Sequence, residues 1–237
     1  FQATTMIISI PSVIILTCFV ISLYGARIRY NTPMLFAISF LPMFAIGGLT
    51  GLPLGLAAAD IHLHDTYYVI GHFHYVVAPG TIFALFAGIY HWFPKVTGRR
   101  MNEFLGKLHF WPSMIGMNMI FGPMFFVGIA GVQRRLWTQV DYNLGQLTQF
   151  WVVFSSVGAA VLGLAQIPFI INFFATAFAG RKVAENPWDA TTLEWAAPSP
   201  PPHGNFLTEP VVYCGPYEYS VPGKKCDFCP QCQPMEA

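Results

Sequence analysis

Five long apolar stretches constrain this chain more than any other feature of its sequence. A helix that crosses a lipid bilayer needs roughly 20 predominantly apolar residues. Five stretches reach that length, at residues 4–25, 33–58, 67–93, 108–131 and 149–178. Charged residues make up only 10% of the 237 residues, against about 25% in an ordinary soluble domain. We therefore predict an all-α membrane protein with five transmembrane helices.

The charged residues divide the chain into two parts. Residues 1–180 contain four acidic residues, whereas residues 181–237 contain seven, together with more than half of the prolines. This contrast predicts a transmembrane helical bundle over 1–180 and a polar, proline-rich tail over 181–237. The net charge is +1 and no basic stripe is present, which excludes a nucleic-acid-binding protein.

Loop charges predict the orientation of the helices. Basic residues gather in the first and third loops and at the start of the tail: Arg27, Arg29, Lys95, Arg99, Arg100, Lys107, Arg181 and Lys182. Five alternating helices place these segments on one side, which the positive-inside rule assigns to the cytoplasm or its organellar equivalent. Only Arg134 and Arg135, in the fourth loop, break this pattern. The chain starts with Phe1 close to its first apolar stretch, so we expect it to be a piece of a longer protein.

Residues 60–75, DIHLHDTYYVIGHFHY, contain four of the seven histidines. His72 and His74 lie inside the third predicted span, where such side chains are costly and are candidates for function. A helix turns 100° per residue, so these two imidazoles point about 200° apart and cannot share one metal. They suit two separate cofactors, of which heme is the leading one because imidazole is a common axial ligand. Gly71 would leave room for a flat macrocycle. The alternative is that both histidines form only structural hydrogen bonds.

Two further groups lie toward the outer ends of the spans. His64 and Asp65 are adjacent, and a carboxylate with one or two further donors can hold a hard cation that keeps several waters. The alternative is a capping aspartate beside an interfacial histidine, and Asp60 can likewise be a simple loop acid. Arg134 and Arg135 suit bidentate binding of the two propionates of a heme, or they belong to a solvated loop.

The segment HDTYYVIGHFHYVV (64–77) closely resembles the helix-ten signature of subunit I of heme–copper cytochrome c oxidases. Further similar segments are TMIISIP (5–11), GGLTGL (47–52), HWFPKVTGR (91–99), GxxRR (131–135) and LEWxxPSPPPHGNF (193–206). The resemblance covers nearly the whole chain and implies helices eight to twelve and the carboxyl-terminal tail of a twelve-helix subunit. The tail looks more like those of bacterial, caa3-like oxidases than mitochondrial ones, which implies the bacterial cell membrane and a cytoplasmic tail.

The resemblance implies roles for the central histidines. His72 resembles the proximal ligand of the high-spin heme, where oxygen binds. His74 resembles one of the two axial ligands of the low-spin heme, and Phe73 would lie between the two macrocycles. Both hemes would be of the heme a type.

The resemblance also implies roles near the outer surface. His64 and Asp65 resemble ligands of a magnesium or manganese ion near subunit II. Asp60 resembles an acid near a propionate of the high-spin heme. Arg134 and Arg135 resemble the arginine pair that faces heme propionates.

The implied activity is that of a terminal respiratory oxidase. Electrons would pass from cytochrome c through a copper centre in subunit II to heme a and on to heme a3 and copper B. Oxygen would be reduced to water there, coupled to proton translocation. The copper B ligands and the second axial ligand of the low-spin heme are expected in the N-terminal part of subunit I, and subunit III is a further expected partner.

Other functions remain open. A quinol oxidase of the same superfamily is one, although Tyr75 after H-F-H favours the cytochrome c branch. A non-catalytic membrane subunit or transporter is another. A membrane zinc protease is disfavoured. Its zinc ligands must share one helix face, whereas the side chains of His72 and His74 point in different directions.

One departure from the family concerns proton uptake. Many members read I-P-T-G-x-K in helix eight, whereas this chain reads Ile10-Pro11-Ser12-Val13-Ile14-Ile15, with Ile15 in place of the lysine. Thr5 and Ser12 are candidates for holding a water chain instead, but such hydroxyls in membrane helices often bond to their own backbone.

Five cysteines complete the candidate residues. Cys18 lies in the first span and is expected to be a small apolar filler. The other four lie in the tail, at Cys214, Cys226, Cys229 and Cys232. A reducing compartment argues against disulfides. The C-x2-C-x2-C spacing with a fourth cysteine upstream is open to zinc or iron–sulfur ligation, and free thiols are the alternative.

Overall fold

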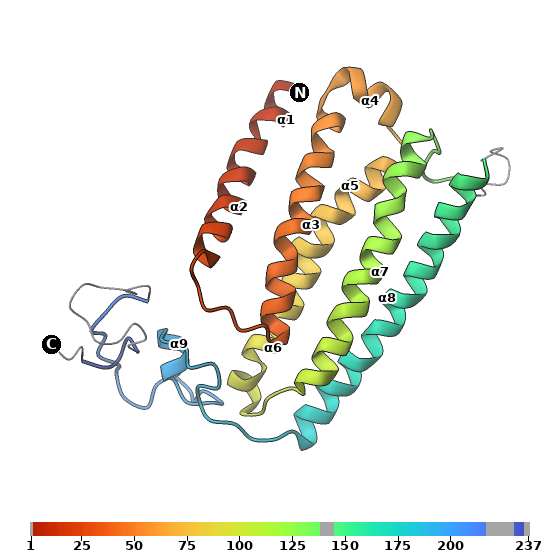
Figure 1. Ribbon diagram of the computed structural model, residues 1–237. Coiled ribbons are helices and arrows are strands. Elements are labelled where there is room, and N and C mark those ends of the chain that lie inside the picture. The colour runs from red at the N-terminus through yellow and green to blue at the C-terminus, as the bar shows by residue number, and fades with distance from the viewer. Residues whose placement is uncertain (1, 138–144, 217–229, 235–237) are drawn as a thin grey trace. The chain divides into compact units, whose positions relative to one another are not determined.

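A computed structural model describes residues 2–137, 145–216 and 230–234 of the chain. Its helices are α1 (Gln2–Ile7), α2 (Ser9–Leu23), α3 (Thr32–Gly55), α4 (Ala57–Leu63), α5 (Tyr67–Val77), the π-helix η1 (Ala78–Phe83), α6 (Ala84–Thr97), α7 (Glu103–Ile129), α8 (Gln146–Ala179) and α9 (Leu193–Ala196) (Figure 1). Within the described ranges the only β-type pairing consists of two isolated bridges. The all-α prediction is therefore confirmed.

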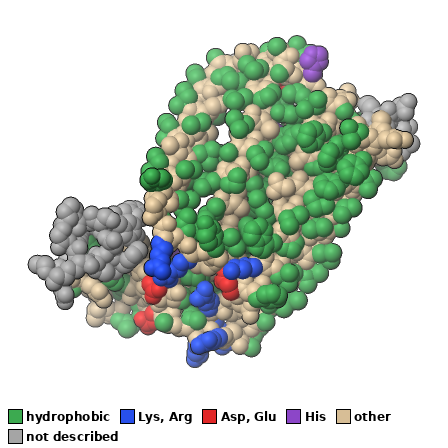
Figure 2. Space-filling model, in the orientation of Figure 1, with side chains coloured by type: hydrophobic (Ala, Val, Ile, Leu, Met, Phe, Trp, Pro, Cys, Tyr) green, Lys and Arg blue, Asp and Glu red, His purple; other side chains and the backbone are tan. Residues whose placement is uncertain are grey.

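Five helical segments in the described part of the chain are long and apolar enough to cross a membrane. They are Gln2–Leu23, Thr32–Gly55, Tyr67–Thr97, Glu103–Ile129 and Gln146–Ala179. Figure 2 shows that hydrophobic side chains cover much of the helical surface facing the viewer. Such a surface is expected where helices contact lipid or pack against other apolar helices. The chain is an integral membrane protein, and the prediction of five long apolar helices is confirmed.

Prolines shape two of these spans. Helix α1 ends at Ile7, four residues before Pro11, which has no N–H to donate to the Ile7 carbonyl. Pro79 lies in η1, a π-helical turn between α5 and α6. Such turns inside membrane helices re-satisfy carbonyls that a proline frees. No sequence signal marked the π turn at Pro79, and the sequence did not predict α4.

The chain forms two compact units, and the first comprises Phe1–Gly88 and Glu103–Ile170. In this unit α5 packs between α3 and α7 (Figure 1). Glycines allow the close approach: a Cβ on Gly47 of α3 would lie 2.9 Å from the Tyr75 carbonyl carbon, and one on Gly128 of α7 would overlap the backbone of Tyr68. Small residues at such crossings are the usual means by which membrane helices pack.

Aromatic rings fill the core of the first unit. Phe36 of α3 is 0% exposed, and its ring lies 4.9 to 5.5 Å from the rings of Phe83, Phe86, His109 and Phe110. The pairs with Phe83 and Phe110 are edge-to-face, and such pairs stabilise by about 1 kcal/mol each beyond their buried area. This core packs α3 and α7 against η1 and the start of α6, which belong to the third span.

The second unit comprises Ile89–Asn102 and Ile171–Ala237. Lys95, at the end of α6, is 8% exposed; its Nζ donates to the Ala197 carbonyl at 2.6 Å and lies 4.9 Å from the centre of the Trp195 ring. The Trp188 indole N–H donates to the His91 carbonyl at 3.0 Å. Tail residues thus pack on the end of α6 within this unit. The division into a membrane domain over 1–180 and a separate tail domain stays a prediction.

Replacing Gly128 with valine tests the packing of α5 on α7. The new Cβ would overlap the Tyr68 backbone, which cannot move without displacing the start of α5. We expect a loss of stability on the order of 3 kcal/mol, measured as a lower midpoint of thermal unfolding of the detergent-solubilised protein. Gly163→Val in α8 is the matched control, because a Cβ there meets nothing within 4 Å. Equal effects of the two substitutions would contradict this account.

Candidate functional site

His72 of α5 is held by α3. Its Nδ1 lies 2.8 Å from the carbonyl oxygen of Gly47. A carbonyl only accepts, so Nδ1 carries the proton and donates it. The same nitrogen lies 3.4 Å from the Thr50 hydroxyl, and Cε1 of His72 occupies the place where a Cβ on Gly51 would be, 2.7 Å away. Gly47, Thr50 and Gly51 of α3 therefore contact this imidazole and fix its position.

His74 lies against α7 instead. Its Nδ1 donates to the carbonyl of Ile70, one turn earlier in α5, at 2.9 Å. Its ring stacks on Phe121 of α7, with centroids 4.0 Å apart and planes inclined by 11°. The two imidazoles thus contact different neighbouring helices, as their spacing of two residues predicts.

These hydrogen bonds decide which ring nitrogen is available for chemistry. In a neutral imidazole that protonates Nδ1, the lone pair is on Nε2. A hydrogen bond from Nδ1 also fixes the orientation of the ring and raises the strength of Nε2 as a ligand. His72 and His74 are therefore two separate, oriented, single-nitrogen donors inside one span.

Gly71 and Phe73, the neighbours of the two histidines, differ in how closely other residues pack against them. Gly71 is buried, and a Cβ there would lie 3.1 Å from the Phe121 carbonyl oxygen and from the Phe125 ring. The interpretation of Gly71 as room for a macrocycle is wrong, because α7 fills that space. Phe73, by contrast, is 39% exposed, with its ring centroid 4.3 Å from that of His74.

Four predicted residues meet in one polar cluster at the start of α5. Oδ1 of Asp65 accepts hydrogen bonds from Nε of Arg134 at 2.8 Å and from Nη2 of the same side chain. Nε2 of His64 lies 3.5 Å from Oδ2 of Asp65, and Nδ1 of His64 lies 3.5 Å from Oδ2 of Asp60. The sequence predicted separate roles for the acids and the arginines, and the ion pair of Asp65 with Arg134 was missed.

The backbone joins the same two segments. Tyr67 N–H donates to the Val132 carbonyl at 3.0 Å, and Arg134 N–H donates to the Asp65 carbonyl at 2.8 Å. Asp65 and Arg135 have φ values of 57° and 67°, a left-handed conformation that is uncommon outside glycine. Such conformations persist only where surrounding contacts hold them. No sequence signal marked either position.

Charge in this cluster favours the ionised form of Asp65. The hydrogen bond from Arg134 lowers the pKa of the Asp65 carboxyl, and the nearby charges of Arg134, His64 and Arg135 lower it further, against an opposing effect of desolvation. In the described ranges, no three His, Cys, Asp or Glu side chains are arranged to hold a metal ion. A cation at His64 and Asp65 would therefore need further ligands.

The remaining candidate residues lie elsewhere. The Ser12 hydroxyl donates to the Ile8 carbonyl of its own helical region at 3.2 Å, and the Thr5 side chain lies against Gly55 of α3. Cys18 is exposed on α2, Cys214 is buried and Cys232 is half-buried. Cys226 and Cys229 lie outside the described residues.

Comparison with known protein families identifies the family of this chain. Residues 1–161 match the family model described as "Cytochrome C and Quinol oxidase polypeptide I".

The chain belongs to the heme–copper oxidase subunit I family.

Three relatives show how this member compares with others of the family. Cytochrome c oxidase subunit 1 of Synechocystis sp. is 50% identical over 93% of this chain and 39% of its own length. The alternative cytochrome c oxidase subunit 1 of Bradyrhizobium diazoefficiens is 44% identical over 99% of this chain and 40% of its own. Quinol oxidase subunit 1 of Bacillus subtilis is 41% identical over 90% of this chain and 33% of its own. The chain thus spans about two-fifths of the length of the first two relatives and a third of the last.

A solved structure also resembles this heme–copper oxidase chain. It is a heme-copper terminal oxidase dimer determined by cryo-electron microscopy, with a TM-score of 0.56 and 25% identity. The match covers 65% of this chain and 28% of that one. Sequence and fold therefore lead to the same family.

Replacing Arg134 with glutamine tests the ion pair with Asp65. Loss of the guanidinium hydrogen bond removes the main stabilisation of the carboxylate, so the pKa of Asp65 rises toward about 3.9, the ordinary value for aspartate. The measurement is a pH titration of the carboxyl infrared band, assigned with Asp65→Asn. Arg135→Gln is the matched control and shifts the pKa less, because Arg135 acts on Asp65 only through its charge. An equal shift in both variants would contradict the assignment.

Proposed function

We propose that this chain is the carboxyl-terminal part of the catalytic subunit of a bacterial cytochrome c oxidase, in which His72 and His74 are axial ligands of two different hemes. The observation that carries the proposal is the pair of Nδ1 hydrogen bonds to the carbonyls of Gly47 and Ile70. They leave each Nε2 as a donor on its own side of α5.

The residues of the chain fit these two groups. His72 is the proposed ligand of the high-spin heme and His74 of the low-spin heme, while the exposed ring of Phe73 lies in the sequence between them. When bound, hemes of the a type together with copper B supply one-electron transfer and oxygen reduction. The protein contributes two oriented imidazoles and an apolar surrounding that limits water. Copper B and the second low-spin ligand are proposed to be held by the N-terminal part of subunit I.

The polar cluster at the start of α5 is the proposed outer boundary of this centre. Asp65 orients Arg134, and Arg135 follows it, so two guanidinium groups lie in one loop and suit heme propionates. Asp60 is proposed to lie near a propionate of the high-spin heme. His64 and Asp65 are proposed to bind magnesium or manganese with ligands from subunit II, since a hard cation favours several oxygen donors.

Cytochrome c is the proposed electron donor, reached through the copper centre of subunit II, and subunit III completes the proposed complex. Tyr75 supports this branch; its hydroxyl donates to Asn118 of α7 at 2.8 Å. A quinol donor is the second candidate, because a quinol oxidase subunit 1 is 41% identical to this chain. Oxygen consumption by the purified complex separates the two, since reduced cytochrome c supports it in the first case and a quinol in the second.

Coupled proton translocation is part of the proposed activity, with the tail on the cytoplasmic side of the membrane. Ile15 stands where many relatives have a lysine, so the uptake route differs from theirs at this place. Thr5 on α1 and Ser12 on α2 are the proposed candidates for holding a water chain there, and the Ser12 hydroxyl also donates to the Ile8 carbonyl.

Replacing each central histidine with leucine tests the proposed ligands in the assembled complex. We expect His74→Leu to abolish the low-spin heme signal and His72→Leu to abolish the high-spin heme signal, because each variant removes the imidazole that is the proposed ligand of that heme. Reduced-minus-oxidised spectra and heme extraction measure this, with heme content falling by about half in each case.

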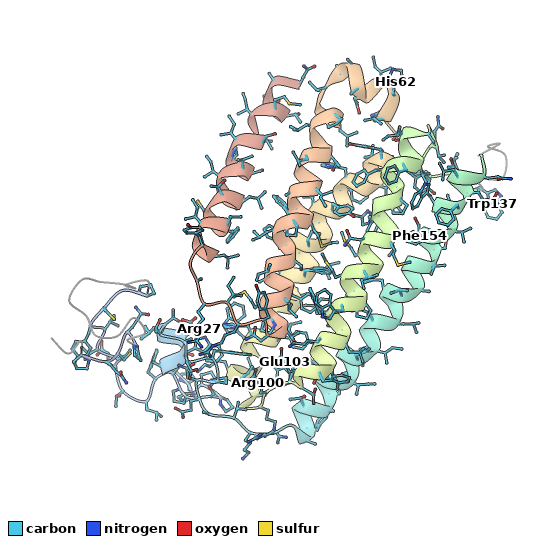
Figure 3. The ribbon with its side chains drawn as sticks, in the orientation of Figure 1. Arg27, His62, Arg100, Glu103, Trp137 and Phe154 are labelled. Atoms are coloured by element: carbon cyan, nitrogen blue, oxygen red, sulfur yellow. The ribbon has the colours of Figure 1, made fainter. Side chains whose placement is uncertain are left out.

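His62→Leu is the matched control for these variants. His62 is exposed on α4 at one end of the first unit, opposite Glu103 (Figure 3), and its loss leaves both heme signals unchanged. A complex without heme absorption would favour the transporter alternative and would contradict the proposal, as would two variants that lose the same signal.

A further inference from the structure

The Thr50 hydroxyl of α3 lies beside the hydrogen bond that holds His72. Its Oγ1 lies 2.8 Å from the carbonyl oxygen of Ile46 and 2.9 Å from that of Gly47. The Gly47 oxygen is the same atom that accepts from Nδ1 of His72 at 2.8 Å, and Oγ1 itself lies 3.4 Å from Nδ1. Three polar atoms from two helices therefore form one triangle on the Nδ1 side of the imidazole.

The protons available in this triangle show that two donors share one oxygen. A hydroxyl has one proton to donate, and a carbonyl oxygen only accepts, so Thr50 donates to Gly47, to Ile46 or to both at once. Serine and threonine in membrane helices can bond to their own backbone in this way, and Ser39 of α3 donates to the Phe36 carbonyl at 2.8 Å. Thr50 differs from Ser39 because one of its two acceptors also holds an imidazole.

Close packing against α3 keeps the ring of His72 next to these oxygens. A Cβ on Gly51 would lie 2.7 Å from Cε1 of the ring, so the imidazole lies directly on the α3 backbone. The position of the ring is therefore set by packing. The strength of its hydrogen bond then depends on the electron density that the Gly47 oxygen has left for Nδ1.

We propose that Thr50 is a positioning residue that weakens the hydrogen bond from His72 to Gly47 and thereby sets how strongly Nε2 donates to the high-spin heme. The inference rests on the proposed function, in which His72 is the ligand of that heme. Two donors that share one oxygen draw on the same electron density, so each bond is weaker than it would be alone. A weaker bond from Nδ1 makes Nε2 a weaker ligand, and hydrogen bonding around an axial ligand is one means by which a protein sets the potential of a heme.

His74 is a reference within the same helix. Its Nδ1 donates to the Ile70 carbonyl of α5 at 2.9 Å, and its ring stacks on Phe121 of α7. A change at Thr50 of α3 therefore reaches the acceptor of His72 and not that of His74. The low-spin heme, whose proposed ligand is His74, is expected to stay unchanged.

Resonance Raman spectra and a redox titration of the purified, reduced complex test the proposal. Thr50→Val keeps the shape of the side chain and removes the hydroxyl. We expect the iron–histidine stretching band of the high-spin heme to move to higher frequency, because the freed Gly47 carbonyl binds Nδ1 more strongly. The ratio of reduced to oxidised high-spin heme at a fixed potential falls by up to about tenfold, since a stronger donor favours oxidised iron.

Three variants control this test. Thr50→Ser keeps the hydroxyl, so both readouts stay at the values of the unmutated complex. Ser39→Ala is the matched control, because it also removes a hydroxyl that bonds to a carbonyl of α3, and it leaves the high-spin heme unchanged. Thr50→Ala removes the same hydroxyl with a smaller side chain and is expected to shift both readouts as valine does, so it provides the test if the valine variant assembles poorly.

The outcomes separate this inference from the assignment of His72. An unchanged band in Thr50→Val and Thr50→Ala, a shift to lower frequency, or a Thr50→Ser variant that behaves like Thr50→Val overturns the proposal and leaves His72 as a heme ligand. An equal shift at the low-spin heme also overturns it, because the effect would then not pass through His72. An unmutated complex without an iron–histidine band contradicts the proposed function itself, and the inference with it.

Discussion

The hydrogen bonds from two imidazole Nδ1 atoms to backbone carbonyls are the interaction on which the rest of the structure depends. One carbonyl belongs to α3 and the other to α5 itself. Each bond settles a tautomer and a ring orientation at once, so a single span presents two nitrogen donors in different directions. The packing of α5 between α3 and α7 serves this geometry, because it fixes the helix that carries both rings.

Close helix packing is what allows such precision in a membrane, where no hydrophobic effect drives helices together. Glycine at positions 47, 71 and 128 brings the backbones of α3 and α7 against α5. At the start of α5, the loop after α7 is bonded to the residues before α5 through both backbone and side chains. The span that carries the histidines is thus held by glycine and aromatic contacts with both α3 and α7, and at its start by an ion pair.

Much of this could be predicted from the sequence. Uninterrupted apolar length specified the five spans, and a spacing of two residues specified that His72 and His74 diverge, because both follow from helix geometry alone. The pairing of Asp65 with Arg134 could not be predicted, since it depends on how the loop after α7 folds back over the start of α5. The left-handed backbone at Asp65, the π turn at Pro79 and the role of Gly71 likewise depend on neighbours that are remote in sequence.

A density map of the assembled oxidase complex at a resolution that shows side chains tests the central claim most directly. The account predicts that Nε2 of His72 and Nε2 of His74 each contact a different iron atom, while each Nδ1 remains bonded to the carbonyl of Gly47 or Ile70. Rings that contact only protein atoms, or an iron bound at Nδ1, would contradict it.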